Sequence, residues 1–195
     1  MIMENKNDKT GRKAPVLSVK DMALTALFSA LMAVCAWITI PVPDIPFTLQ
    51  LFAIFAAMFI LGGKRAFISV IIYVLIGAVG VPVFSGFKGG LSSLLGPTGG
   101  YIIGFIFSVA VYWLITARLP KKTAVQIISA VISLLVCYAF GTLWFVIVYS
   151  KYAGPVGFGA ALLMCVVPYI IPDLCKIALA FAVSKLIKKA IGSAV

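Results

Sequence analysis

Histidine is absent from this chain of 195 residues, and acidic side chains are scarce, with five Asp and Glu against 16 Lys and Arg. The lack of histidine excludes acid–base catalysis through imidazole and the usual zinc ligand sets. The phosphate-loop pattern G-x-x-x-x-G-K-[ST] is also missing, which excludes ATP hydrolysis by that kind of site. Asp173 is the one acidic residue within the apolar runs, and aspartyl proteolysis needs two carboxylates. No serine stands in an evident nucleophile context, so we expect that the protein is not an enzyme.

The chain has four cysteines, none spaced as C-x-x-C, and each lies within an apolar run. This placement is typical of small buried side chains, and it predicts neither a metal site nor a redox pair. The four are Cys35, Cys137, Cys165 and Cys175.

Apolar residues dominate what is present: 63% of the chain is hydrophobic and 11% is charged. These proportions predict an all-α integral membrane protein, since a span needs roughly 17–25 apolar residues. We expect six transmembrane helices and one membrane domain over residues 20–190, after a flexible cytosolic arm over residues 1–19. The arm lacks the order of a secretory signal, so the first apolar run is expected to remain as a helix. The expected helices cover about 22–40, 47–61, 66–83, 99–117, 124–149 and 158–187.

The basic residues predict the orientation of this bundle. With the N-terminus inside, 13 of the 16 Lys and Arg fall on the inner side, so both termini are expected in the cytoplasm. The net charge of +11 could suggest nucleic acid or anionic lipid, but the positions of the basic residues favour topology as the simpler explanation, and no base-stacking pattern or folded basic face indicates nucleic acid. The 13 are Lys6, Lys9, Arg12, Lys13, Lys20, Lys64, Arg65, Arg118, Lys121, Lys122, Lys185, Lys188 and Lys189.

A glycine-rich stretch interrupts the apolar runs between residues 81 and 105, where seven of the 17 glycines fall. Glycine and the two prolines of this stretch disfavour a continuous helix. Gly96, Gly100 and Gly104 repeat every four residues, which suits either close helix contact or the close approach of a small molecule. Lys88 lies in this stretch on the expected outer side, against the charge bias.

The last apolar run contains an acidic and a basic residue, Asp173 and Lys176, three positions apart and therefore on one helix face, with Tyr169 one turn earlier. Ionisable groups within a membrane cost about 2.5–3.5 kcal/mol each, and they usually line a functional cavity. Two interpretations remain open: a cavity wall, or an ion pair that locks the bundle. Gln50, near the outer end of the second expected helix, could likewise cap that helix or face a ligand.

Three segments together resemble the BioY family, the biotin-specific substrate-binding subunits of energy-coupling-factor (ECF) transporters. They are the block from Gly80-Val-Pro-Val-Phe-Ser-Gly86 to Leu95-Gly-Pro-Thr-Gly-Gly-Tyr101, the segment Pro46-Phe-Thr-Leu-Gln50, and the pair Asp173-x-x-Lys176. The Ala26-x-x-x-Ala30 pair looks like the motif by which such subunits dock on the shared coupling protein. Two departures are Lys88, where relatives often have Asn, and Pro172, where Gly is usual.

This resemblance implies a high-affinity biotin-binding subunit of an ABC-type vitamin importer in the bacterial cytoplasmic membrane. A transmembrane coupling protein and two ABC ATPases would be its partners, and no cofactor is implied. The pocket would lie near the outer side under residues 41–46 and 84–98. The implied ligand contacts are Asp173 with the ureido N–H groups, Lys176 or Lys88 with the carbonyl or tail carboxylate, Gly86, Gly89 and Gly90 against the ring, Phe87, Tyr101 and Tyr169 as walls, and Gln50. The alternative is a stand-alone proton-coupled transporter of a small anionic metabolite, with Asp173 carrying the proton.

Overall fold

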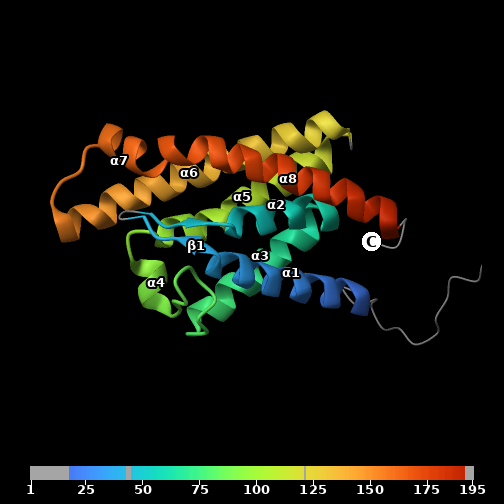
Figure 1. Ribbon diagram of the computed structural model, residues 1–195, viewed down its shortest axis with the longest axis horizontal. Helices are drawn as coiled ribbons and strands as arrows, with labels where there is room; N and C mark the ends of the chain where they lie inside the picture. The colour runs from blue at the N-terminus through green and yellow to red at the C-terminus, as the bar shows by residue number, and fades with distance from the viewer. Residues whose placement is uncertain (1–17, 43–44, 121, 192–195) are drawn as a thin grey trace, which may run out of the picture.

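The computed structural model describes residues 18–42, 45–120 and 122–191, and nearly all of the predicted N-terminal arm lies outside them. The described chain is a bundle of helices with one short hairpin (Figure 1). Its elements are α1 (Val19–Trp37), β1 (Thr39–Ile40), β2 (Phe47–Thr48), α2 (Gln50–Leu61), α3 (Gly63–Ala78), α4 (Leu91–Leu95), α5 (Gly99–Arg118), α6 (Thr123–Ala153), α7 (Phe158–Cys165) and α8 (Val167–Ile191).

Helix α2 is the core of the bundle, because every residue from Ala53 to Leu61 is buried. It packs against α1, α3, α5 and α8, and α6 packs along α5. Glycine permits the α5–α6 contact: a Cβ on Gly100 would lie 2.2 Å from the Trp144 side chain, and one on Gly104 would lie 3.3 Å from the Cys137 carbonyl oxygen. Two of the three evenly spaced glycines therefore serve helix packing, whereas Gly96 ends α4 and lies outside α5.

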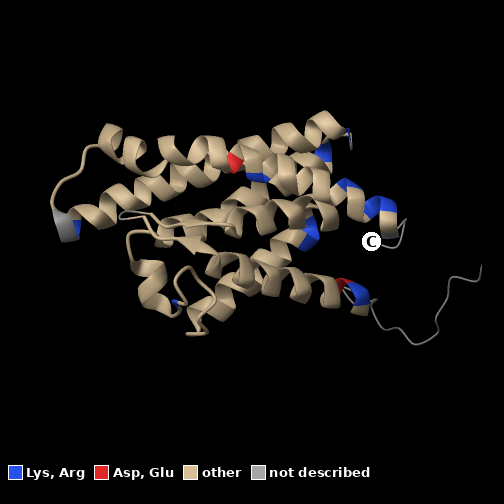
Figure 2. Ribbon diagram, in the orientation of Figure 1, with Lys and Arg blue, Asp and Glu red and all other residues tan. Residues whose placement is uncertain are grey.

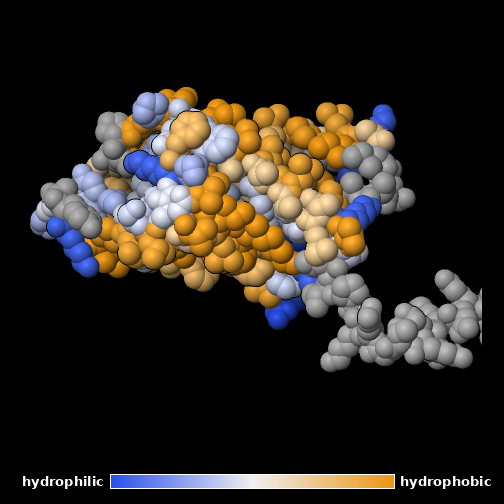
Figure 3. Space-filling view, turned by 90° about the horizontal axis from the view of Figure 1, so that it is seen from below, coloured by the Kyte–Doolittle hydropathy of each residue, from blue (hydrophilic) through white to orange (hydrophobic). Residues whose placement is uncertain are grey.

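The membrane character of the fold is visible in its long helices. Among the described residues, α1, α5 and α6 are long and apolar enough to cross a bilayer, and α7 with α8 makes a fourth candidate span if the bent pair counts as one. Apolar side chains cover much of the middle of the face in Figure 3. In a bilayer such an outward apolar surface contacts lipid.

The first corrections concern the ends of the first two expected helices. Helix α1 ends at Trp37 and not at Ile40, and α2 begins at Gln50 and not at Phe47. The residues between form an antiparallel hairpin in which Thr39 pairs with Thr48. Apolar composition alone does not distinguish these extended residues from helix, and the β-branched Ile38, Thr39 and Ile40 favour strand geometry. The all-α expectation is therefore amended by one two-stranded sheet.

Other boundaries also differ from the prediction. Helix α3 covers 63–78 and not 66–83, because Gly80 takes a φ of 107° and the chain turns there. The glycine-rich stretch contains the short helix α4. The last expected helix is two helices, α7 and α8, which meet at Val166 with a bend of 43°.

Basic residues gather at the end of the molecule where α1 begins and α8 ends (Figure 2). We call this the basic end, and the opposite end, with β1, β2, α4 and the α6–α7 connection, the loop end (Figure 1). At the basic end, Asp21 completes a capping box with Ser18 and pairs with Arg65, whose Nε lies 2.8 Å from its Oδ1. This contact ties the starts of α1 and α3 together.

Candidate functional site

A cavity of about 90 Å³ lies inside the bundle, between the hairpin and the helices α2, α5, α6, α7 and α8. Its lining combines aromatic and aliphatic side chains with a small number of polar groups, the usual character of a small-molecule site. The residues are Ile45, Pro46, Thr48, Gln50, Leu51, Ser85, Thr98, Tyr101, Ile102, Phe105, Cys137, Tyr138, Cys165, Tyr169, Asp173 and Lys176.

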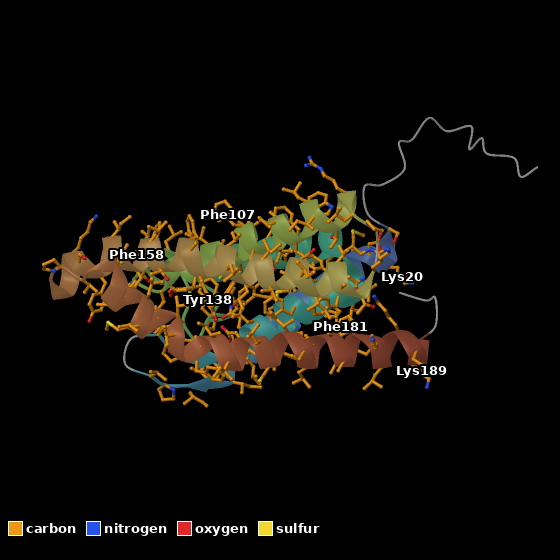
Figure 4. The ribbon with its side chains drawn as sticks, turned by 90° about the horizontal axis from the view of Figure 1, so that it is seen from above. Lys20, Phe107, Tyr138, Phe158, Phe181 and Lys189 are labelled. Carbon is orange, nitrogen blue, oxygen red and sulfur yellow. The ribbon has the colours of Figure 1, made fainter. Side chains whose placement is uncertain are left out.

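The polar centre of this cavity is a cluster of three side chains. Lys176 Nζ lies 2.8 Å from Asp173 Oδ1, and the Tyr138 hydroxyl donates to Asp173 Oδ2 at 2.6 Å. Asp173 is 2% exposed and Lys176 is 6% exposed, so water screens this pair very little. Figure 4 shows Tyr138 between the ribbons of α6 and α8. The Asp and Lys of the sequence prediction are thus together, and each oxygen of the carboxylate has a donor.

Local sequence places Asp173 within α8. Pro168 stands in the first turn of this helix, where a missing N–H costs nothing, and α7 ends just before it. Pro172 lies inside α8 and lacks the N–H that would bond the carbonyl four residues earlier. The helix therefore begins beside the cavity, and its first turns carry Tyr169, Asp173 and Lys176 on the face that lines it.

The hairpin segment closes the cavity through aromatic contacts. Lys176 Nζ lies 3.9 Å from the centre of the Phe47 ring, a cation–π contact. The Tyr169 ring stacks on Phe47 with centres 6.3 Å apart, and its hydroxyl donates to the Ile45 carbonyl. These contacts join β2 to α8 directly.

Two further polar side chains are held by neighbours. Gln50 is 5% exposed, and its Nε2 donates to the Tyr73 hydroxyl at 2.8 Å, which in turn donates to the Val83 carbonyl at 2.9 Å. The Tyr101 hydroxyl lies 3.0 Å from Thr142 Oγ1 on α6. Both Gln50 and Tyr101 line the cavity. The structure therefore brings five of the predicted site residues to one place: Gln50, Tyr101, Tyr169, Asp173 and Lys176.

The five predicted residues of the glycine-rich loop do not line this cavity; among the described residues of that loop, Ser85 and Thr98 do. Gly86 and Lys88 line a second cavity, of about 630 Å³, at the loop end. Phe87 is 64% exposed and stacks on Trp37 with ring centres 5.1 Å apart. Their role as ligand contacts stays a prediction.

The backbone of the loop itself requires glycine at positions 89 and 90. A Cβ on Gly89 would lie 2.4 Å from the Val81 carbonyl oxygen, so the loop backbone packs against the turn that follows α3. Gly90 takes a φ of 84°, and its N–H donates to the Gly77 carbonyl at 2.7 Å. These glycines shape the loop that carries Lys88, whatever the ligand.

Ala26 and Ala30 lie on the exposed side of α1, outside the cavity. Sequence reasoning missed Tyr138, Phe47 and Thr98. The sequence holds no distinctive signal for Tyr138, since tyrosines also occur elsewhere in its apolar runs. Among the residues that the structure describes, no group of three or more Cys, Asp and Glu side chains is close enough to hold a metal ion.

A family model describes this combination of segments: the model of the BioY family matches residues 5–193. The chain belongs to the BioY family. This BioY chain is 38% identical over 169 residues to a probable biotin transporter BioY of Pyrococcus horikoshii, covering 87% of this chain and 96% of that protein. It is 39% identical over 173 residues to a biotin transporter BioY of Thermotoga maritima, covering 88% of this chain and 97% of that protein.

A solved structure has the same fold. The S-component for biotin from an ECF-type ABC transporter superposes on this BioY chain with a TM-score of 0.78, at 24% sequence identity, over 91% of this chain and 95% of that one. Together with the apolar helices, this family membership makes the chain a membrane protein with a helical S-component fold.

Proposed function

We propose that this BioY chain is the high-affinity biotin-binding membrane subunit of an ECF-type ABC importer. One observation carries the proposal: a buried carboxylate, a buried ammonium and a tyrosine hydroxyl converge on one cavity in a chain of this family. The ureido ring of biotin offers two N–H donors and one carbonyl acceptor. Asp173 suits the donors, and Lys176, which has N–H groups beyond the one given to Asp173, suits the acceptor, while Tyr138 donates its O–H to Asp173 and holds that carboxylate in place.

The charges support one orientation of the ligand. Asp173 and Lys176 neutralise each other, so an anionic tail beside them would be buried without a counter-charge. Lys88 is the cation that lines the second cavity, toward the loop end. We therefore place the ureido ring beside Asp173 and the valerate carboxylate toward Lys88. In this proposal Lys176 contacts the ureido ring and Lys88 contacts the valerate carboxylate.

The sizes of the two cavities fit that placement. Alone, the cavity at Asp173, of about 90 Å³, is smaller than a typical ligand pocket of roughly 300–1,000 Å³. It shares the lining residues Pro46, Ser85, Thr98 and Ile102 with the cavity of about 630 Å³, so the two are neighbours. In our proposal the ligand occupies both, and the shared residues surround the junction between its ring and its tail.

The remaining parts of the proposal concern topology and partners. We propose six membrane crossings, by α1, α2, α3, α5, α6 and the α7–α8 pair, within one substrate-binding domain over residues 20–190. The charge bias supports a cytoplasmic position for the basic end and both termini, in the bacterial cytoplasmic membrane. The exposed Ala26 and Ala30 would contact a transmembrane coupling protein, and two ABC ATPases would supply the energy. The chain itself would carry no cofactor and catalyse no reaction.

Calorimetry on the purified protein in detergent tests the ligand and the site. We expect tight biotin binding by the wild type, a large loss of affinity in Lys176→Ala and Asp173→Asn, and unchanged affinity in Lys185→Ala, an exposed charge of the same helix. Wild type that gives no heat with biotin, but does with thiamine or riboflavin, would reassign the substrate.

Transport assays separate the proposal from a proton-coupled transporter. Proteoliposomes with this chain alone are expected to bind biotin without accumulating it, and accumulation is expected when the coupling protein, both ATPases and ATP are added. Accumulation driven by a proton gradient across vesicles that contain this chain alone would overturn the energy-coupling part.

A further inference from the structure

A third cavity, of about 610 Å³, opens at the basic end, far from the groups assigned to biotin. The ends of six helices surround it: the starts of α1, α3 and α6 and the ends of α2, α5 and α8. An aromatic layer stands on its inner side, where Phe59 makes edge-to-face contacts with Tyr112 and Phe181 at 6.1 and 5.4 Å between ring centres. The biotin proposal gives this cavity no role.

The charged groups of this cavity favour an anion. Among its described lining residues, Lys64, Arg65 and Lys188 are cationic and Asp21 is anionic, a net charge of +2. Asp21 is already engaged by Arg65 at 2.8 Å. Lys188 Nζ donates to the Phe59 carbonyl at 2.7 Å, which fixes its ammonium over the end of α2. The lining therefore carries an excess of positive charge, and the Lys188 ammonium within it is held in place.

The start of α3 adds backbone donors to the same cavity. Gly62 and Gly63 line it, and no side chain caps this helix of 16 residues. The first N–H groups of a helix have no partner within it and carry a partial positive charge, which favours phosphate-like anions. Gly63 also sits where a Cβ would lie 2.5 Å from the Trp113 Cα, so the start of α3 is held close to α5.

The apolar part of the lining distinguishes a lipid from a free anion. Trp113 and Ala117 of α5 and Leu61 of α2 share the cavity with the cations. Because the cavity is bounded by the terminal turns of helices whose middles are apolar, it lies at the level of lipid headgroups. We propose that it binds the phosphate of an anionic glycerophospholipid, with Lys64, Lys188 and the start of α3 as its ligands and Trp113 against the glycerol and upper chains.

Native mass spectrometry of the full chain, after detergent delipidation, tests this site. The probes are dioleoyl phosphatidylglycerol and dioleoyl phosphatidylcholine, which share their acyl chains, with sodium phosphate and glycerol 3-phosphate as free anions. The test variant is Lys64→Gln/Lys188→Gln. Its control, Lys185→Gln/Lys189→Gln, loses the same charge at the same end from residues outside the cavity.

We expect the wild type and the control to retain phosphatidylglycerol in preference to phosphatidylcholine, and the test variant to retain about 30-fold less of it, from two lysines acting on an anionic headgroup. Biotin affinity should be unchanged in both variants. Equal retention of the two lipids by the wild type, or equal losses in the two double variants, would overturn the proposal. Tight binding of free phosphate that excludes the lipid would overturn its lipid part. If the double variant does not fold, the single Lys64→Gln, which leaves the Lys188 contact intact, carries the same test with about a fivefold loss.

Discussion

Replacing Lys176 by Met removes the ammonium from the buried pair while keeping a side chain of similar length. The nitrogen that is lost lies 2.8 Å from Asp173 Oδ1 and 3.9 Å from the centre of the Phe47 ring. The carboxylate, 2% exposed, keeps its hydrogen bond from Tyr138 but loses its counter-charge. Breaking a buried pair in this way costs about 3–5 kcal/mol of folding free energy, more than the cation–π contact of about 0.5–2 kcal/mol contributes.

The double variant Asp173→Asn/Lys176→Met should be more stable than Lys176→Met. It buries no charge, and the Asn carbonyl oxygen can still accept from the Tyr138 hydroxyl. Replacing a whole buried pair by neutral side chains is often close to neutral for stability. We therefore expect a coupling free energy of about 2 kcal/mol or more between the two positions, near the upper part of the range for contacting residues.

Equilibrium unfolding in mixed micelles without biotin, followed by circular dichroism, measures the four members of this cycle. Lys189→Met, an exposed position on the same helix, should change stability by less than about 0.5 kcal/mol. If the effects of the two single changes add up to that of the double variant, the pair contributes no coupling and the argument from burial is refuted.

Further predictions concern the cavity walls and the ligand's tail. Tyr138→Phe removes a donor 2.6 Å from Asp173, and we expect biotin affinity to fall by about 10- to 100-fold in calorimetry, as for hydrogen bonds to charged groups; an unchanged affinity would exclude Tyr138 from the site. Gly141→Ala places a Cβ 2.3 Å from the Tyr101 ring, so we expect a loss of about 1–3 kcal/mol in the same unfolding assay, and an unaltered stability would contradict this packing. Lys88→Ala should weaken biotin about two- to fivefold but leave its methyl ester unaffected, and equal losses for acid and ester would refute the tail assignment.

The sequence was sufficient to locate the polar centre but not to complete it. Asp173 and Lys176 stand out because an ionisable residue in an apolar run is rare, and their spacing places them on one helix face. Tyr138 does not stand out, because a tyrosine in such a run looks like any other aromatic residue. Its contact with Asp173 depends on how α6 is positioned along α8, which is a property of the packed bundle.

The elements at the loop end were harder to predict for a different reason. Hydropathy identifies apolar runs without distinguishing strand from helix, so the pairing of Thr39 with Thr48 was not foreseen. The role of a glycine is equally ambiguous in the sequence. Gly89 is required because a Cβ at this position would meet the Val81 backbone, but a glycine would also suit a close contact with a ligand. Pro168 is the sequence signal for the break between α7 and α8. Proline is favourable in the first turn of a helix and unfavourable in its interior, and Pro168 lies in the first turn of α8.

The contacts of Phe47 have a consequence for kinetics. One face of this ring meets the ammonium of Lys176, and Tyr169, from the same helix, stacks on it and bonds to the neighbouring Ile45 carbonyl. The hairpin segment that covers the cavity is therefore in direct contact with Lys176 and Tyr169, two residues that would hold the ligand. In the proposed complex, a bound molecule that draws Lys176 toward itself would weaken these contacts, and its departure would restore them. We therefore expect a substitution at Phe47 to change both the affinity for biotin and its residence time.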